Sequence, residues 1–318
     1  MNNTNNNSIQ AVREIIDEVK KAVIGKDKII IKILLAILAK GHILIEDIPG
    51  VGKTTMALAF SKALSLEYNR VQFTPDVLPT DVTGFTVYNK NTGSFDFKSG
   101  ASMCNLLLAD EINRTSSKTQ SALLEIMEEG KVTVDGTTHK LPRPFIVMAT
   151  QNPIGSVGTQ ALPESQLDRF MLKLSMGYPD ITSEVEILKV KSNYNPLEYI
   201  SSIADSEDII ALQKVVENIH VDDKIYMYVA RLAEATRNHP MIKLGISTRG
   251  ALALMAVSKA TALLKGRSYV IPDDIAYMYK DVFAHRLILN SNAKINNLSA
   301  EQILDDIFKN VKQPDLAN

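Results

Sequence analysis

Residues 47–55 of this 318-residue chain combine the residue types that bind phosphate groups. Glycines let backbone N–H groups curl around phosphate oxygens, a lysine reaches the terminal phosphates of a nucleotide, and a threonine hydroxyl binds Mg²⁺. A short apolar segment precedes these residues and a helical one follows, which is the context such a loop needs. We expect ATP to contact the whole segment and Mg²⁺ to bind Thr54. The segment comprises Asp47, Ile48, Pro49, Gly50, Val51, Gly52, Lys53, Thr54 and Thr55.

One position in this segment departs from the usual pattern. Asp47 stands where phosphate-binding loops commonly have their first glycine. A chance glycine-rich turn is the alternative interpretation of the segment, and the acidic residues described next argue against it.

Two acids end an apolar segment near the middle of the chain, where Asp110 and Glu111 follow residues 105–109. In nucleotide hydrolases, one such acid holds the magnesium shell through water and the other polarises the attacking water. We expect Asp110 in the first role, as a Mg²⁺ ligand, and Glu111 in the second. An acid pair alone also occurs where a buried strand runs out into solvent, so this interpretation depends on the phosphate-binding segment.

A third apolar segment, 145–149, runs into a polar cluster that ends at Asn152. Ligands of parallel sheets bind at the carboxyl ends of the strands. We therefore expect Asn152 near Lys53 and Glu111, where its amide orients the attacking water or touches the γ-phosphate. An Asn-Pro turn that only ends the strand is the alternative.

The elements that position these residues are short apolar strands alternating with helices. This alternation predicts an α/β fold with a parallel sheet sandwiched by helices. After residue 180, long amphipathic patterns replace the apolar strands and predict a smaller all-α domain over 181–318. The Asn-rich start, 1–8, is predicted to be a disordered tip, which leaves 9–180 as the nucleotide-binding core. We expect strands at 42–46, 71–73, 106–109 and 145–149, and helices at 27–40, 54–64, 183–191, 206–217, 222–238, 248–264 and 272–287.

The composition limits the expected partners and cellular location of the protein. The formal net charge is −1, so no overall electrostatic attraction to nucleic acid or anionic lipid is expected, and nucleic-acid binding is disfavoured. The single cysteine, Cys104, cannot form an internal disulfide. The most apolar run, 29–39, is far shorter than a membrane-spanning helix requires. We expect a cytoplasmic protein that does not insert into membranes.

With these motifs in place, the segment 106–170 closely resembles the MoxR family of AAA+ ATPases. The resemblance implies a P-loop NTPase core with a helical lid domain, ATP and Mg²⁺ as cofactors, and assembly into a homo-oligomer, a hexameric ring. The residues that carry it are Ala-Asp-Glu-Ile-Asn-Arg (109–114), Lys-Thr-Gln-Ser-Ala-Leu-Leu-Glu (118–125), Ala-Thr-Gln-Asn-Pro (149–153) and Leu-Pro-Glu-Ser-Gln-Leu-Asp-Arg-Phe (162–170).

The resemblance also implies roles for residues outside the first three motifs. Arg169 matches the arginine finger that is supplied to the nucleotide of a neighbouring subunit, and Arg249 matches the second-sensor arginine of the lid. The segment Val23-Ile24-Gly25 matches the one that lines the adenine, although core packing would explain it equally well. Arg114 either reaches across the subunit interface or is an ordinary helix-surface arginine.

Two further segments resemble insertions of this family. The alternating run 131–143, with its Asp-Gly turn, predicts a β-hairpin, and 81–100 is similar to an insertion in the second helix. In such rings both elements usually face the central pore or the client protein. The aromatic residues of the second segment are therefore candidates for client contact, with packed hydrophobes as the alternative; they are Phe85, Tyr88, Phe95 and Phe97.

The leading functional hypothesis is an ATP-hydrolysing, ring-shaped, chaperone-like remodeller that assembles or activates a client protein. In this family the client often has a von Willebrand factor A domain. A nucleotide-controlled binding switch with slow hydrolysis is the main alternative, and a DNA-acting motor is a weaker one.

Overall fold

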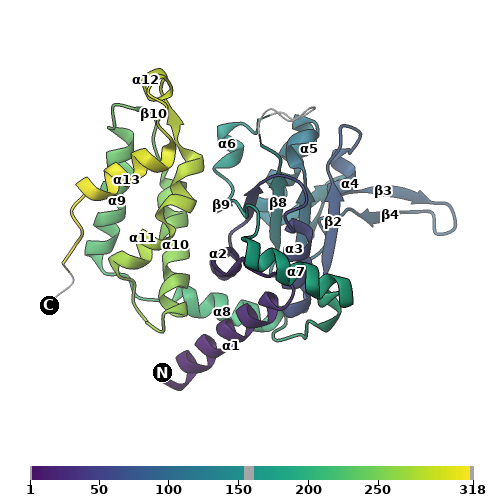
Figure 1. Ribbon diagram of the computed structural model, residues 1–318. Coiled ribbons are helices and arrows are strands. Elements are labelled where there is room, and N and C mark those ends of the chain that lie inside the picture. The colour runs from purple at the N-terminus through teal and green to yellow at the C-terminus, as the bar shows by residue number, and fades with distance from the viewer. Residues whose placement is uncertain (1, 154–160, 316–318) are drawn as a thin grey trace.

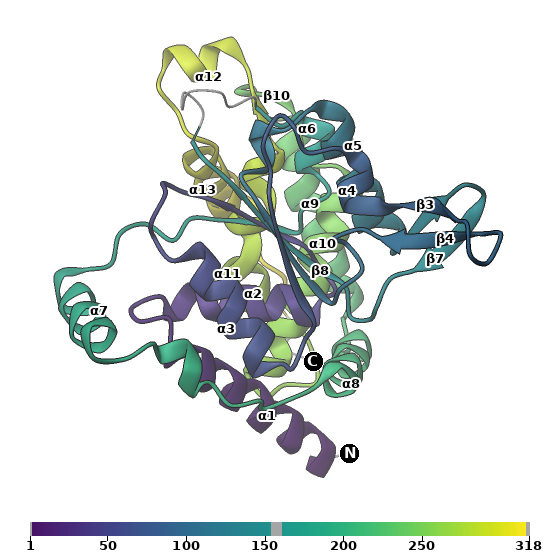
Figure 2. The ribbon, with the colours of Figure 1, turned by 90° about the vertical axis from the view of Figure 1, so that its right-hand side faces the viewer.

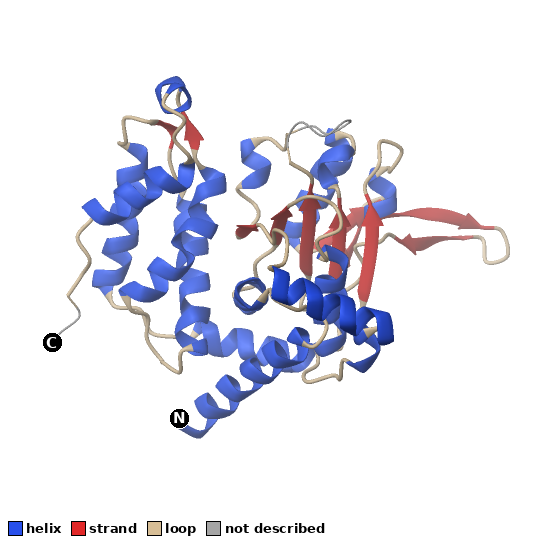
Figure 3. Ribbon diagram, in the orientation of Figure 1, coloured by secondary structure: helices blue, strands red, loops and turns tan. Residues whose placement is uncertain are grey.

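The computed structural model describes residues 2–153 and 161–315. Its first half contains a sheet covered by helices, and its second half is almost entirely helical (Figures 1 and 3). The two halves lie side by side, and a two-stranded ribbon projects from the sheet-containing half on the side away from the helical half (Figure 1). Within the described ranges, no helix has the length and apolar character needed to cross a membrane.

A five-stranded parallel sheet forms the centre of the first half, in the order β2-β5-β8-β1-β9. Every residue of β5 and β8 is buried, as expected of parallel strands covered on both faces. The predicted α/β sandwich is confirmed, and the strand β9 is an addition that the sequence did not indicate. The strands are β1 (Ile43–Glu46), β2 (Tyr68–Gln72), β5 (Leu106–Asp110), β8 (Ile146–Gln151) and β9 (Leu172–Leu174).

Alternate strand residues pack into two different apolar cores, because successive side chains of a strand point to opposite faces. Leu106 and Leu108 join one core, whereas Leu107 and Ala109 join the other. The first core continues without a break into the helical half, so the two halves share buried apolar contacts. The helices of the first half are α1 (Asn2–Lys20), α2 (Asp27–Leu38), α3 (Lys53–Ala63), α4 (Pro79–Thr83), η1 (Ile112–Arg114), α5 (Ser117–Glu129) and α6 (Glu164–Leu167).

The chain start differs from the prediction of a disordered tip over residues 1–8. Helix α1 already begins at Asn2, and Met1 lies outside the described residues. The apolar positions Val12, Ile15 and Val19 are fully buried and hold the helix in place. Once a helix is nucleated, each added residue gains a hydrogen bond without a new nucleation cost, so polar residues extend it toward the N-terminus.

The second half contains a helical bundle, as predicted, with the addition of a short antiparallel pair of strands. Helix α8 packs against both α2 and α10 and so connects the halves. Helix α7 has no buried residue and lies beside the sheet-containing half (Figure 2). The elements are α7 (Ile181–Asn193), η2 (Pro196–Tyr199), α8 (Ser206–Glu217), α9 (Asp223–Arg237), β10 (Ile242–Leu244), α10 (Thr248–Leu264), α11 (Pro272–Phe283), η3 (Ala284–Arg286), β11 (Ile288–Leu289), α12 (Ser291–Ile295) and α13 (Ala300–Asn310).

Both predicted insertions are β-hairpins. Strands β6 (Lys131–Val134) and β7 (Thr137–Lys140) pair around Asp135 and Gly136, which both have positive φ, as a tight hairpin turn requires. Strands β3 (Gly84–Asn89) and β4 (Ser94–Ser99) form the projecting ribbon. The ring of Phe97 stacks on that of His139 with centroids 3.8 Å apart, so the two hairpins contact each other.

Candidate nucleotide-binding site

The loop between β1 and α3 has the backbone conformation of a phosphate cradle. Gly50 and Gly52 have φ values of 86° and 95°, in the left-handed region that favours glycine. A Cβ atom at Gly50 would meet no atom within 4 Å, so this side of the loop is open. Helix α3 begins at Lys53, which places its free N–H groups and positive dipole end at the loop. The remaining predicted contacts lie on the loop or on the first turn of α3; they are Ile48, Pro49, Val51, Thr54 and Thr55.

The ammonium of Lys53 lies within this cradle. Its Nζ donates hydrogen bonds to the carbonyl oxygens of Asp47 at 2.7 Å and of Ile48 at 3.2 Å. Burial lowers the pKa of Lys53, while the negative charges of Asp110, Asp47 and Glu111 act in the opposite direction. Three carboxylates therefore act on one buried cation. These are the charges that a triphosphate with its magnesium ion would meet on binding.

The acid at the end of β5 is fixed by two neighbours. The Oδ1 atom of Asp110 accepts a 2.5 Å hydrogen bond from the hydroxyl of Thr150, and its Oδ2 atom pairs with Arg70 at 2.7 Å. The same Thr150 hydroxyl accepts a 2.9 Å bond from the backbone N–H of Glu111. Sequence reasoning missed Thr150 and Arg70. The only signal for Thr150 was its place in the polar cluster that ends β8.

Glu111 is held by two side chains of its own chain. Its Oε1 atom accepts a 3.0 Å hydrogen bond from Asn152, and its Oε2 atom pairs with Arg114 at 2.7 Å. Burial raises the pKa of Glu111, but the hydrogen bonds from Arg114 and Asn152 outweigh it, so the pKa lies below its usual value. Glu111 also has a φ of 56°, a strained value for a non-glycine residue and one that is found disproportionately at active sites.

Asn152 lies where the sequence places it, beside Glu111. Its Nδ2 atom donates to Glu111, while its Oδ1 atom is buried and, within the described part of the chain, has no hydrogen-bond partner. A buried unpaired carbonyl oxygen is costly and suggests a missing donor such as a water molecule. Asn113 supports the arrangement by donating to the backbone oxygen of Asn152 at 3.1 Å.

These residues fit ATP and Mg²⁺. Magnesium usually keeps several water ligands and takes one or two carboxylates together with substrate phosphates. The site offers Thr54, on the first turn of α3, and Asp110, at the end of β5, together with an open backbone cradle. Within residues 2–153 and 161–315, no group of three or more His, Cys, Asp and Glu side chains is placed to hold a metal ion.

The segment expected to line the adenine lies between α1 and α2. Val23 is buried, and Gly25 has a φ of 72°. A Cβ atom at Gly25 would come within 2.3 Å of the hydroxyl oxygen of Ser183, so this segment, including Ile24, runs directly against the first turn of α7. The structure thereby places Val23, Ile24 and Gly25 at the start of the helical half.

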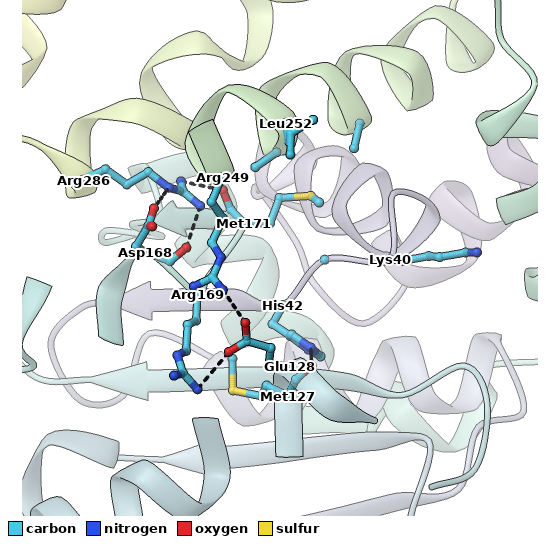
Figure 4. Close-up of a pocket in the computed structure, with 13 residues that line it drawn as sticks. Lys40, His42, Met127, Glu128, Asp168, Arg169, Met171, Arg249, Leu252 and Arg286 are labelled. Carbon is cyan, nitrogen blue, oxygen red and sulfur yellow. Dashed lines mark hydrogen bonds and ion pairs between the residues drawn. The ribbon is translucent and has the colours of Figure 1, made fainter. Parts of the chain in front are cut away.

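The two predicted arginines, by contrast, are not beside the phosphate loop. Arg169 and Arg249 line a cavity of about 360 Å³ and pair with the two carboxylate oxygens of Glu128 (Figure 4). Leu172, at the start of β9, is level with Ile43, at the start of β1. Arg169 precedes β9 and the loop follows β1, so in this parallel sheet they lie at opposite ends of the strands.

Arg286 holds the loop that carries Arg169. Its guanidinium pairs with the carboxylate of Asp168 at 2.8 Å and donates to the backbone oxygens of Phe170 at 2.6 Å and Met171 at 3.2 Å (Figure 4). Only 6% of Arg286 is exposed. The arginine loop is therefore fixed from the helical half, by a contact that the sequence did not indicate.

Comparison with known proteins agrees with this geometry. Residues 42–172 match the model described as the ATPase family associated with various cellular activities, and residues 234–307 match an AAA lid domain. Chaperone MoxR1 of Mycobacterium tuberculosis is 38% identical over 96% of this chain and 83% of its own length. This chain is a MoxR-family AAA+ ATPase.

Two other similar proteins extend the match over nearly the whole MoxR-family chain. The uncharacterized protein YeaC of Bacillus subtilis is 49% identical over 94% of this chain and 93% of its own. A crystal structure from Cytophaga hutchinsonii has a TM-score of 0.92 and 38% identity, and covers 98% of this chain and 97% of the other. The match includes the helical half, so the AAA+ core and its lid are shared as one unit.

Proposed function

We propose that this MoxR-family protein hydrolyses ATP with Mg²⁺ at the loop between β1 and α3. The observation that carries this proposal is the convergence of Lys53, Asp110 and Glu111, whose charges act on one another at the carboxyl ends of β1 and β5. Glu111 polarises the attacking water, and Asn152 holds the carboxylate of Glu111 in place. Bound Mg²⁺ supplies charge neutralisation at the phosphates, with Asp110 and Thr54 as its protein ligands.

The low pKa of Glu111 fits this role. Arg114 and Asn152 stabilise the ionised carboxylate, so Glu111 can accept a hydrogen bond from water throughout the neutral pH range. Arg114 thus acts within its own subunit in the structure, as a partner of Glu111. Its position in the short helix η1 directly after the acid pair makes this contact local, three residues apart in sequence.

We further propose that the protein works as a homo-oligomeric ring, a hexamer. Arg169 and Arg249 lie at the opposite strand ends from their own phosphate loop, so they would serve the nucleotide of a neighbouring subunit. A contact between two different faces of one chain is heterologous and generates a closed ring when the rotation permits. An arginine supplied in this way neutralises charge that develops on the transferred phosphoryl group and links hydrolysis to assembly.

The proposed output is the remodelling of a client protein in the cytoplasm, a role in keeping with the chaperone name of the relative MoxR1. The β3–β4 ribbon carries three exposed aromatic residues: Phe85 is 46%, Tyr88 53% and Phe95 72% exposed. Exposed aromatic clusters are typical of protein-binding surfaces. Phe97 differs, since it packs against the second core and His139. A client with a von Willebrand factor A domain remains our candidate.

The experiment that tests hydrolysis uses Glu111→Gln. We expect this variant to bind ATP with Mg²⁺ and to release phosphate at less than about one hundredth of the wild-type rate, because the water loses its general base. Near-wild-type phosphate release would remove Glu111 from its role. Absence of Mg²⁺-dependent ATP binding by the wild-type protein would overturn the whole proposal, including the nucleotide-switch alternative.

The ring is tested by mixing two inactive variants. Arg169→Ala subunits lack the arginine but keep Lys53, whereas Lys53→Ala subunits lack the cradle but keep Arg169. If the arginine acts in trans, mixed rings contain some complete sites and phosphate release reappears. Activity that never returns in mixed rings, confirmed as mixed by size and by differential labelling, would contradict catalysis across the interface.

A further inference from the structure

Asp47, the residue that replaces the usual first glycine of the loop, is a buried hydrogen-bond acceptor. It is 7% exposed, and its Oδ2 atom accepts bonds from the backbone N–H groups of Met176 and Gly177, both at 2.6 Å, and from the hydroxyl of Ser175 at 3.1 Å. Its Oδ1 atom accepts a 2.8 Å bond from the N–H of Ile48. In every contact the partner is an N–H or O–H donor. This suits an ionised carboxylate, whereas an asparagine side chain would turn its NH₂ group toward one of these donors.

The same stretch of chain is held from its other side by Lys26. The Nζ atom of Lys26 donates to the backbone oxygens of Met176 at 2.6 Å, Gly177 at 3.0 Å and Tyr178 at 2.9 Å. An ammonium has three N–H donors, so these three oxygens satisfy it completely. Lys26 is 9% exposed and directly follows the segment expected to line the adenine.

Residues 176–178 therefore lie between the carboxylate of Asp47, in the phosphate loop, and the ammonium of Lys26, which follows the segment expected to line the adenine. We call Asp47, Lys26 and residues 176–178 the charge clamp. The clamped residues connect the last strand of the sheet, β9, to helix α7. The start of α7 also lies directly against Gly25, since a Cβ atom there would overlap the side chain of Ser183.

We propose that Asp47 and Lys26 are positioning residues that make the two nucleotide-facing segments and the start of α7 move as one body. Asp47 reaches the nucleotide site directly, because its backbone oxygen accepts a hydrogen bond from Lys53. A phosphate that draws Lys53 toward itself weakens this bond and shifts the loop, and the carboxylate of Asp47 passes the shift to residues 176–178. This inference rests on nucleotide binding at the loop, as proposed above, and adds the route by which binding reaches the helical half.

Hydrogen–deuterium exchange measures this coupling directly. In the wild-type protein, saturating Mg²⁺ and the non-hydrolysable analogue AMP-PNP are expected to slow amide exchange over residues 176–193. The Asp47→Ala variant removes the carboxylate that accepts from these amides, so without nucleotide the amides of Met176 and Gly177 should exchange about tenfold to a hundredfold faster. At analogue concentrations that saturate each variant, Asp47→Ala and Lys26→Met should lose the nucleotide-dependent slowing over α7.

Two exposed residues provide matched controls. Asp17→Ala in α1 and Lys28→Met in α2 make the same charge changes at exposed positions outside the clamp, and should keep the wild-type exchange pattern. Retention of the nucleotide-dependent slowing over α7 in both clamp variants, at confirmed saturation, overturns the proposal. Unchanged ligand-free exchange at Met176 in Asp47→Ala also overturns it.

A failure of the proposed function would look different. If wild-type protein shows no AMP-PNP binding, the nucleotide site itself is wrong, while the ligand-free exchange rates still decide whether Asp47 holds residues 176–178. If a clamp variant loses AMP-PNP binding at every concentration, its residue is a nucleotide ligand and the positioning role is refuted.

Discussion

The pH dependence of stability offers a quantitative test at His42, the residue before β1. The ring is buried between the sheet and α5: its Nδ1 atom accepts a 3.0 Å bond from the N–H of Val147, and its Nε2 atom lies 3.0 Å from the backbone oxygen of Met127. This pattern requires the neutral form with its proton on Nε2. A second proton on Nδ1 would face the N–H of Val147. Burial accordingly lowers the pKa of His42 to about 4.

The sign and size of the effect follow from linkage. The folded pKa lies below the unfolded value of about 6.5, so the unfolded chain binds more protons between those two values. The free energy of unfolding therefore falls as the pH falls through this window. The full effect is about 3 kcal/mol, of which about 2 kcal/mol is lost between pH 7 and pH 5.

The perturbation is His42→Asn, which keeps an oxygen for the N–H of Val147 and cannot be protonated in this range. The assay is thermal unfolding followed by circular dichroism at pH 7, 6 and 5. The variant is less stable at pH 7, but its free energy of unfolding should fall less on acidification. The gap in Tm between the two proteins should therefore narrow by about 3 °C at pH 5. His285, whose pKa is lowered in the same direction, is present in both proteins and cancels. Parallel pH profiles of the two proteins would refute the reasoning.

Three other predictions rest on single contacts. Arg114→Ala removes a bond that keeps the pKa of Glu111 low, so the acidic limb of the kcat profile should move to higher pH, while Arg114→Lys should move it less. Asp168→Asn leaves the buried Arg286 without its carboxylate partner, and calorimetry should show that the free energy of unfolding falls by about 2–3 kcal/mol. Burial raises the pKa of Cys104 to about 12, so iodoacetamide at pH 8 should label it only after unfolding; rapid labelling of the folded protein would contradict this.

The convergence of the nucleotide-site residues could be predicted from the sequence because it needs only two rules. Strands with near-continuous apolar runs are parallel, and the carboxyl ends of parallel strands share one edge. Lys53, Glu111 and Asn152 each follow such a strand, so their proximity does not depend on an accurate register. The bounds of α8 and α10 were equally accessible, since capping residues, Asp205 and Ser247, stand directly before each helix.

What the sequence did not indicate are the contacts between residues far apart in the chain. Thr150 bridges Asp110 and Glu111 only because the register sets Ala149 level with Ala109. Lys26 contacts a segment 150 residues further along, and no local pattern marks that pairing. The strand β9 is too short to show a recognisable alternation of apolar and polar residues. Its place at the sheet edge follows from tertiary packing alone.

The hydrogen bonds from Arg286 to the arginine loop limit where the chain can be truncated. A fragment that stops at residue 180 would contain the phosphate loop, the acid pair and Arg169, so by motif it would be complete. It would nevertheless lose every donor that Arg286 gives to Asp168, Phe170 and Met171. Such a fragment would present its arginine on an unsupported loop. A chain that keeps this support for the arginine loop therefore extends at least through η3, whatever motifs lie upstream.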